Sequence, residues 1–319
     1  MMTNTIEFIE NYWKHNECNN LKPKEILQLI SPKECPNLYI GYNELGNRCL
    51  FLKTDLQNFP KIDNEKTNIA LKISEENSII YIELSDNYFG EIFNDLIISL
   101  FNKIKNIPIS ESKFQFIALF NKWNELFKNK FKKDHLSENE LLGLLGELVY
   151  LKEKLTEAED PFQVNEYINS WSGPDGNAND FIFSDLHVEV KSIEQQKQFV
   201  NISSEFQLNN LELPIHLLVY KTVRTQDGFS LVDLVNDIRD LIENKIGDLD
   251  CFLLKLNQYN IDFKSTNFYE DFKICITDKS LYNTNDVDFP KISADNIYNG
   301  IFNVKYKISL KELLKYKIN

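Results

Sequence analysis

Two acidic residues and a lysine lie close together within residues 180–191, which read DFIFSDLHVEVK. Apolar and polar residues alternate on both sides of Ser184-Asp185, which is typical of two strands joined by a tight turn. A two-residue turn pairs the apolar residues with one another and places Asp180 opposite Glu189, with Cβ atoms about 4.5–5.5 Å apart. A register shifted by one residue would move Asp180 to the wrong face. The pattern therefore predicts a hairpin that brings two carboxylates together.

Two carboxylates this close repel each other unless a cation lies between them. Oxygen ligands of this kind suit Mg²⁺, which one or two carboxylates hold together with water and substrate phosphate. Lys191 lies two residues after Glu189 and therefore on the same face of the strand. Its ammonium group could contact a phosphate, stabilise developing negative charge and position an attacking water. This combination indicates metal-dependent hydrolysis of a phosphodiester.

The elements around the hairpin are expected to position a third carboxylate. Ser137 and Glu140 have the spacing of a capping box, so a helix should begin there and run to about Leu155. Glu147 lies in that helix within the apolar stretch GLLGELVY, where burial of a carboxylate without a function would be energetically costly. The following elements are expected to be strands over 180–184, 186–192 and 198–202, a short helix that Ser203 or Ser204 caps and that extends to Leu211, and a strand over 215–223. This order describes an α/β unit with a mixed sheet.

These residues resemble the PD-(D/E)XK nuclease superfamily, on Asp180, Glu189, Val190 and Lys191 together with Glu147 of the preceding helix. The resemblance implies a restriction-endonuclease-like αβββαβ core. It also implies that Asp180 and Glu189 bind Mg²⁺, with Mn²⁺ as a substitute, and that the Val190 carbonyl is a third ligand. Lys191 would assist the nucleophilic water, and Glu147 would bind or orient a second metal ion or a water.

Two further residues enter this interpretation. Gln207 is expected to approach the site from the short helix, which would add it to the catalytic group. The literal Pro-Asp pair in this part of the chain is Pro174-Asp175 rather than a pair that contains Asp180. Asp175 would fall opposite position 194, too far along the strand to share an ion with Glu189. We therefore prefer Asp180 as the metal ligand and keep Asp175 as the alternative.

The segments GLLGELVYL, WSGPDGNANDF and EVKS are similar, over residues 137–223, to an uncharacterised bacterial PD-(D/E)XK-motif family. Its members accompany DNA methyltransferases and helicase-like ATPases in restriction or phage-defence gene clusters. This similarity implies a Mg²⁺-dependent DNA endonuclease, for which a homodimer would supply two sites to cut both strands. The alternatives are a non-catalytic subunit that serves as a scaffold or DNA clamp, and a nuclease for RNA or branched DNA.

The whole chain is expected to form three regions. Residues 1–108 are predicted to be an N-terminal α+β domain of unknown role, 109–225 the nuclease core with its leading helices, and 226–319 an α/β extension packed on the core. Outside the core, the periodicity predicts helices over 5–17, 89–107, 112–131, 231–246, 250–259 and 311–318, and strands over 38–42, 48–53, 69–73, 78–84, 273–277 and 301–308.

Composition limits the partners and the compartment. The 319 residues carry a net charge of −13, which argues against strong autonomous affinity for DNA, although the lysine runs at 128–133 and 305–317 are candidate phosphate contacts. No apolar run reaches the roughly 18 residues needed to cross a bilayer, and the N-terminus has no secretory pattern. The five cysteines are scattered. A reduced, cytoplasmic protein is expected, with Trp171 as a packing residue and His187 at the rim of the site.

Overall fold

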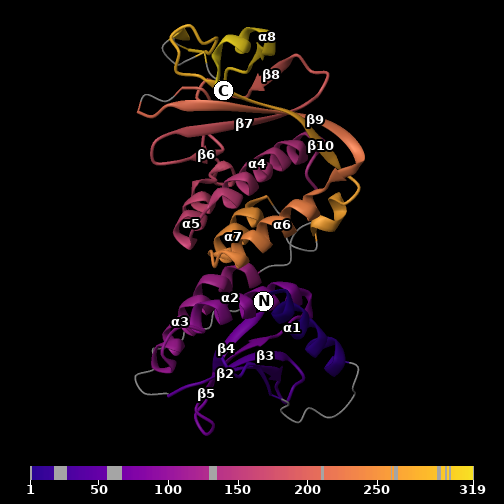
Figure 1. Ribbon diagram of the computed structural model, residues 1–319, viewed down its shortest axis with the longest axis vertical. Helices are drawn as coiled ribbons and strands as arrows, with labels where there is room; N and C mark the ends of the chain where they lie inside the picture. Colours follow the sequence, from indigo (N-terminus) through magenta and orange to yellow (C-terminus); the bar gives the residue numbers. More distant parts are fainter. Residues whose placement is uncertain are drawn as a thin grey trace. The chain divides into compact units, whose positions relative to one another are not determined.

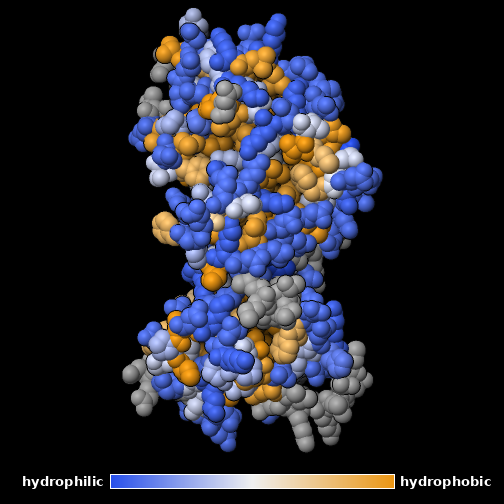
Figure 2. Space-filling view, viewed as in Figure 1, coloured by the Kyte–Doolittle hydropathy of each residue, from blue (hydrophilic) through white to orange (hydrophobic). Residues whose placement is uncertain are grey.

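The computed structural model describes residues 2–17, 27–55, 67–128, 135–209, 212–259, 261, 265–292, 296–298, 300–301 and 303–318. Its contacts divide the chain into two compact units. The first comprises Met1–Lys132 and Asp248–Leu254, and the second comprises Lys133–Gly247 and Lys255–Asn319. Over the described ranges, no helix combines the length and the apolar character that a membrane span requires. The visible face of each unit is largely hydrophilic, with apolar side chains scattered among polar ones (Figure 2).

The first unit is built on an antiparallel sheet with one apolar face. Its strands have the order β1-β2-β3-β5-β4. Leu38 pairs with Leu52 and Tyr42 with Arg48, so the strands predicted over 38–42 and 48–53 are confirmed, and residues 43–47 form the turn between them. Gly46 has a φ of 79° in that turn, a left-handed conformation that glycine adopts without strain. The strands are β1 Gln28–Ser31, β2 Cys35–Tyr42, β3 Arg48–Lys53, β4 Ile69–Ser74 and β5 Ile79–Leu84.

Helices lie on one side of this sheet (Figure 1). They are α1 Met2–Glu17, α2 Gly90–Ile104 and α3 Ile109–Trp123, with 3₁₀ turns at Asn87–Phe89 and Asn124–Phe127. The apolar residues that alternate along the strands, such as Leu50 and Ile82, are fully buried under these helices. Period-two alternation therefore gives the sheet its covered face. The side chains between these residues form a second face, on which Cys49 and Phe51 of β3 are also buried.

The second unit begins with the helix that the capping box predicted. Helix α4 spans Glu138–Glu157, and the Ser137 hydroxyl accepts a hydrogen bond from the Glu140 N–H while the Glu140 carboxylate accepts one from the Ser137 N–H. Helix α5, Pro161–Ser170, was not predicted from the sequence, although the Asp160 side chain caps it and proline occupies its first turn. Further helices are α6 Leu231–Asn244 and the single turn α8 Leu310–Leu313, with 3₁₀ turns at Gly173–Asp175, Ser265–Tyr269 and Leu314–Tyr316. Helix α7, Leu249–Gln258, is divided between the units, since its residues up to Leu254 belong to the first.

A mixed five-stranded sheet forms the centre of the second unit, in the order β12-β10-β9-β7-β6. Strands β7 and β9 are parallel, whereas β6 with β7 and β9 with β10 are antiparallel, so the predicted α/β architecture with a mixed sheet is confirmed. These strands are β6 Phe181–Ile182, β7 His187–Glu194, β9 Ile215–Phe229, β10 Ile274–Asn283 and β12 Lys317–Ile318.

Two details of the expected core were wrong, and so was one element of the C-terminal extension. The αβββαβ order implied that the third strand would join the central sheet, but β8, Phe199–Ile202, pairs instead with β11, Tyr306–Ser309. The edge of β7 away from β6 is taken by β9, which satisfies the backbone groups that β8 would need. In place of the predicted short helix, residues 205–208 form a turn. The basic helix predicted over 311–318 is α8 followed by a 3₁₀ turn and β12.

Both faces of the central sheet are covered. Helices α4 and α6 lie on one side, and the β8–β11 pair with α8 lies on the other (Figure 1). Ile193 on β7 packs into the apolar cluster on the β8–β11 side, together with Val200 and Ile308. Because β7 residues alternate between faces, Glu189 and Lys191 share the face of Ile193. The sheet face that carries the candidate chemistry is thus an interior surface.

Candidate functional site

The hairpin that carries the candidate metal ligands has the predicted register. Phe181 pairs with Val188 and Ile182 with His187, and the Phe183 N–H donates to the Leu186 carbonyl at 2.9 Å. Asp180 comes one position before this ladder. Its carboxylate accepts a hydrogen bond of 2.8 Å from the Val190 N–H, which anchors it beside β7. Local alternation was therefore sufficient to bring Asp180 to the segment that contains Glu189.

Glu189 and Lys191 form a buried ion pair. The Glu189 side chain is 1% exposed and that of Lys191 18%, and 2.6 Å separates the Glu189 carboxylate from the Lys191 Nζ atom. A second contact comes from the Asn179 amide, which donates to the other Glu189 oxygen at 3.3 Å. Taking two charges out of water is costly unless further polar contacts compensate. This arrangement differs from a solvated strand face with a weak surface ion pair.

Helix α4 packs closely on the face of β7 that carries Val190 and Ser192. It buries Glu147 and places it near enough to Asp180 and Glu189 for their charges to add to the effect of burial in raising its pKa. A Cβ atom placed on Gly146 would lie 1.9 Å from the Ser192 hydroxyl, so only glycine permits this approach. One Glu147 oxygen, Oε2, accepts hydrogen bonds from the Trp171 indole at 2.8 Å and from the Tyr259 hydroxyl at 3.1 Å. The loop after α5 also passes against this carboxylate, since a Cβ on Gly173 would lie 2.6 Å from Oε2.

The four ionisable groups influence one another. Burial, and then the charge of Asp180, raises the pKa of Glu147 to about 8. Burial also raises the pKa of Glu189 to about 8, against the opposing effect of the Lys191 ammonium, and it raises the pKa of Asp180. Burial disfavours the charged form of Lys191, but the carboxylates of Glu189 and Asp180 outweigh it and raise its pKa. The three carboxylates and the lysine therefore form one electrostatic group.

The donor set fits a hard divalent cation. Three carboxylates and one ammonium carry a net charge of −2 when all are ionised, and their ligand atoms are oxygens, which Mg²⁺ prefers. Apart from its ion pair with Lys191, the buried Oε1 atom of Glu189 has no hydrogen-bond donor among the described residues. Within the same ranges, no three His, Cys, Asp or Glu side chains lie together in an arrangement that could hold a metal ion. The Lys191 ammonium and the donors to Glu147 instead occupy carboxylate oxygens that a cation would use.

Comparison with known proteins identifies the family. The family model described as "Putative PD-(D/E)XK family member, (DUF4420)" matches residues 9–311. The chain belongs to this PD-(D/E)XK family. The predicted resemblance to the PD-(D/E)XK superfamily is thereby confirmed.

A second comparison finds a partial relative. The chain is 38% identical over 96 residues to the "Holliday junction branch migration complex subunit RuvA" of Mycoplasma capricolum subsp. capricolum, which covers 29% of the chain and 47% of that protein. The chain thus spans less than half the length of this relative. No solved structure matches the chain.

Within this PD-(D/E)XK chain, Asp175 lies apart from the buried group. Its carboxylate is 3.0 Å from the Lys255 Nζ atom and accepts a hydrogen bond of 3.1 Å from the Gln258 amide. The Asp175 side chain is 40% exposed. These contacts give Asp175 a role in holding the loop at Gly173–Asp175 on α7, and they leave Asp180 as the aspartate of the buried group.

Gln207 approaches the site through its backbone rather than its side chain. Its side-chain oxygen accepts a hydrogen bond of 2.7 Å from the Ser203 N–H and so closes the turn that replaces the predicted helix. Its main-chain carbonyl accepts one of 2.6 Å from the Asn179 amide. The carbonyl oxygen of the same Asn179 side chain lies 3.0 Å from Nδ1 of His187. Asn179 is therefore the residue that ties this turn and His187 to Glu189.

The sequence did not indicate the residues that hold the carboxylates in place. Asn179 is 4% exposed, and its one sequence signal was its position next to Asp180. Trp171 is fully buried and its ring is stacked on that of Tyr259 with centroids 6.2 Å apart, so its predicted packing role is confirmed. Its hydrogen bond to Glu147 was missed. Tyr259 lies 112 residues from Glu147 in the chain, and no local pattern could have indicated their contact.

Proposed function

We propose that this chain is a divalent-metal-dependent nuclease that hydrolyses DNA phosphodiester bonds. The observation that carries the proposal is the buried group of Glu147, Asp180, Glu189 and Lys191, whose three carboxylates, when ionised, exceed the lysine by two negative charges and so could balance a divalent cation. Membership of a PD-(D/E)XK family supports the same reading. Buried clusters of like charge are costly to maintain, and they are found where chemistry needs them.

Each residue has a distinct task in this proposal. Asp180 and Glu189 would hold Mg²⁺, or Mn²⁺ as its substitute, together with the Val190 carbonyl, and Glu147 would hold a second ion or a water. When bound, the ion acts as a Lewis acid and lowers the pKa of water. The Lys191 ammonium, which pairs with Glu189 in the structure, would donate to a phosphate oxygen and stabilise its developing charge. Trp171 and Tyr259 would keep Glu147 oriented through their hydrogen bonds.

The biological setting we propose is bacterial restriction or phage defence in the cytoplasm. The support is the similarity of residues 137–223 to proteins that accompany DNA methyltransferases and helicase-like ATPases. Target recognition or partner binding would fall to residues 1–108 and to the extension after residue 225, and a homodimer would supply the second site for a double-strand cut. Branched DNA is a further candidate substrate, because the partial relative is named for a Holliday junction complex.

The test is metal-dependent nicking of supercoiled plasmid. We expect nicking with Mg²⁺, none with EDTA, and a loss of at least about 100-fold in Lys191→Ala and Asp180→Asn variants. Lys152→Ala and Asp237→Asn are matched controls, because these residues form an exposed ion pair of 2.6 Å, and they should retain activity. Circular dichroism would establish that each variant is folded.

The rival reading is a non-catalytic subunit that acts as a scaffold or DNA clamp. It would be supported if the folded chain nicks neither DNA nor RNA and if calorimetry detects no binding of Mg²⁺ or Mn²⁺. The complete set of three carboxylates and a lysine argues against it, because buried charges are costly and a non-catalytic site would not need to retain them.

A further inference from the structure

A row of aromatic side chains crosses the second face of the sheet in the first unit. The strand register places Tyr39 beside Phe51, Phe51 beside Tyr81, and Tyr81 beside Lys72. Directly paired residues of antiparallel strands point to the same side of the sheet. The Phe51 and Tyr81 rings lie 5.2 Å apart with an angle of 31° between their planes. Three aromatic residues and a lysine thus form one continuous row over β2, β3, β5 and β4.

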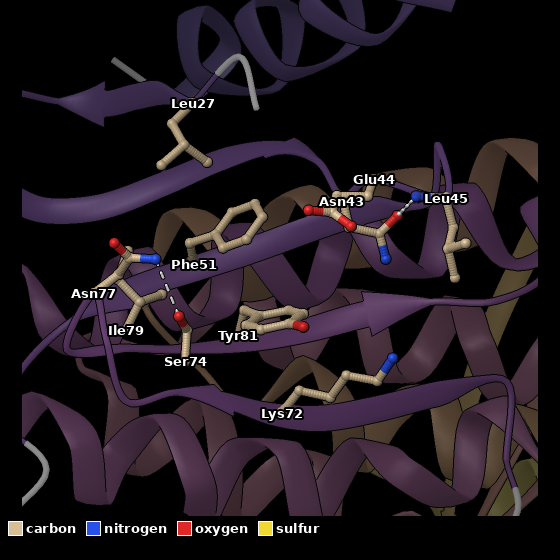
Figure 3. Close-up of a pocket in the computed structure, with 10 residues that line it drawn as sticks. All are labelled: Leu27, Asn43, Glu44, Leu45, Phe51, Lys72, Ser74, Asn77, Ile79 and Tyr81. Carbon is tan, nitrogen blue, oxygen red and sulfur yellow. Dashed lines mark hydrogen bonds between the residues drawn. The ribbon is translucent and has the colours of Figure 1, made fainter. Parts of the chain in front are cut away.

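A hollow of about 420 Å³ opens over this row. Figure 3 shows the Phe51 and Tyr81 rings side by side on the sheet, with Asn43 and Glu44 at one end of the hollow and Asn77 at the other. The walls therefore carry amide and carboxylate groups, whereas the floor is aromatic. This combination suits a flat ligand that has hydrogen-bonding groups on its edge.

Among the described residues, the charges around the hollow disfavour phosphate as the group that it binds. The Lys72 ammonium is paired with the Glu83 carboxylate, which is 5% exposed, so its positive charge is already compensated. Glu44 adds a negative charge to the lining. A phosphate would meet net negative charge here, whereas a neutral ring would not.

Nucleobases have the required chemistry. Aromatic side chains on an open sheet stack unpaired bases, and glutamate accepts a hydrogen bond from the cytosine amino group. A base inside a duplex is stacked on both faces and cannot reach such a floor. We propose that the hollow over Phe51 and Tyr81 binds an unpaired nucleobase of a single-stranded or locally opened nucleic acid. This inference rests on the proposed function for its substrate, and it adds that the chain recognises an unpaired strand.

Binding can be measured without cleavage. Full-length chain carrying Lys191→Ala, in EDTA, would be titrated into fluorescein-labelled 12-nucleotide strands of dA, dC and dT, into the matching RNA strands, and into a DNA duplex of the same length. Fluorescence anisotropy should show tighter binding to single strands than to the duplex. The DNA and RNA arms establish which sugar the unpaired strand carries. The two proposals can fail separately, because the binding assay needs no cleavage. If the wild-type chain never nicks plasmid while the Lys191→Ala chain binds single strands, the proposed function is refuted and this inference stands.

Variants at the hollow test whether it is the binding site. Tyr81→Leu should weaken single-strand binding about 10- to 100-fold, whereas Tyr81→Phe, which keeps the ring, should bind normally. Glu44→Gln should weaken binding of dC strands more than that of dT strands. Phe114→Leu is the control, because Phe114 is a 52% exposed aromatic on α3 outside the hollow. Equal affinity for duplex and single strand, no binding of any strand, or an unchanged affinity in folded Tyr81→Leu would each overturn the inference.

Discussion

Replacing Glu147 by glutamine should stabilise the metal-free protein at alkaline pH. The substitution removes a buried negative charge and keeps the shape of the side chain. Trp171 and Tyr259 both donate to the same oxygen of Glu147, so the single carbonyl oxygen of glutamine can accept both hydrogen bonds. What the variant loses is the charge that repels Asp180.

The magnitude and its pH window follow from the pKa of Glu147. Burial raises this pKa from 4.5 to about 8, which at about 1.36 kcal/mol per pH unit corresponds to a ceiling of about 5 kcal/mol. Between these two values the folded protein holds a proton that the unfolded chain has released, so wild-type stability falls as the pH rises from 4.5 to 8. Glutamine does not titrate, so the variant does not lose this stability over the same pH range. Because neighbouring groups adjust and the hydrogen bonds weaken when their acceptor is neutral, we expect a gain of about 2 kcal/mol at pH 8.5.

Thermal unfolding at pH 5.0, 7.0 and 8.5, with EDTA or with Mg²⁺, would check this expectation. A gain of about 2 kcal/mol should raise Tm by roughly 4–8 °C at pH 8.5 and leave it nearly unchanged at pH 5.0. The control is Glu157→Gln, at a 61% exposed position on the same helix, which should change stability by less than about 0.5 kcal/mol. Added Mg²⁺ should stabilise the wild type more than the variant. A variant that is less stable than the wild type at pH 8.5, or equally shifted at every pH, would refute the reasoning.

The remaining predictions concern the supports of the same group. Asn179→Ala removes a donor to Glu189 and should lower the nicking rate about tenfold, with a raised Mg²⁺ requirement; a normal Mg²⁺ titration would contradict this. Gly173→Ala places a Cβ 2.6 Å from the Glu147 carboxylate and should cost about 1–3 kcal/mol in unfolding free energy. Gly143→Ala is its control, since that helical position is open, and it should stabilise the protein by about 1 kcal/mol. Equal effects at the two glycines would show that Glu147 is not confined as described.

The parts of the site that the sequence predicted are those encoded by neighbouring residues. Period-two alternation and a two-residue turn determine which strand positions face each other, so the register of Phe181 and Val188 follows from the hairpin itself. The capping box at Ser137 likewise predicts where α4 begins. Both signals lie within about a dozen residues, and both were confirmed.

The parts that could not be predicted depend on contacts between distant segments. The position of β8 depends on which strand pairs with the open edge of β7. That strand is β9, which begins 13 residues after β8 ends, and the partner of β8 is β11, from still farther along the chain. The predicted helix at Gln207 failed because polar side chains bond to the backbone of a turn as readily as to that of a helix: the Gln207 side chain accepts a hydrogen bond from the Ser203 N–H, and the Ser204 hydroxyl accepts one from the Phe206 N–H. Asn179 and Tyr259 were missed because their role depends on the tertiary fold. A buried carboxylate needs hydrogen-bond donors, and here other segments of the chain supply them.

An acidic chain that acts on nucleic acid faces a problem that these features would solve together. With a net charge of −13, the protein gains little from the phosphate contacts that supply most non-specific affinity. A divalent ion in the group around Lys191 would offset the local charge at the one place where the scissile phosphate must come close. Base stacking over Phe51 and Tyr81 carries no charge requirement, so it would add affinity without a basic surface. Such a protein would bind a strand where bases are unpaired, would cut it only where metal is bound, and its own charge would keep it from intact duplex elsewhere.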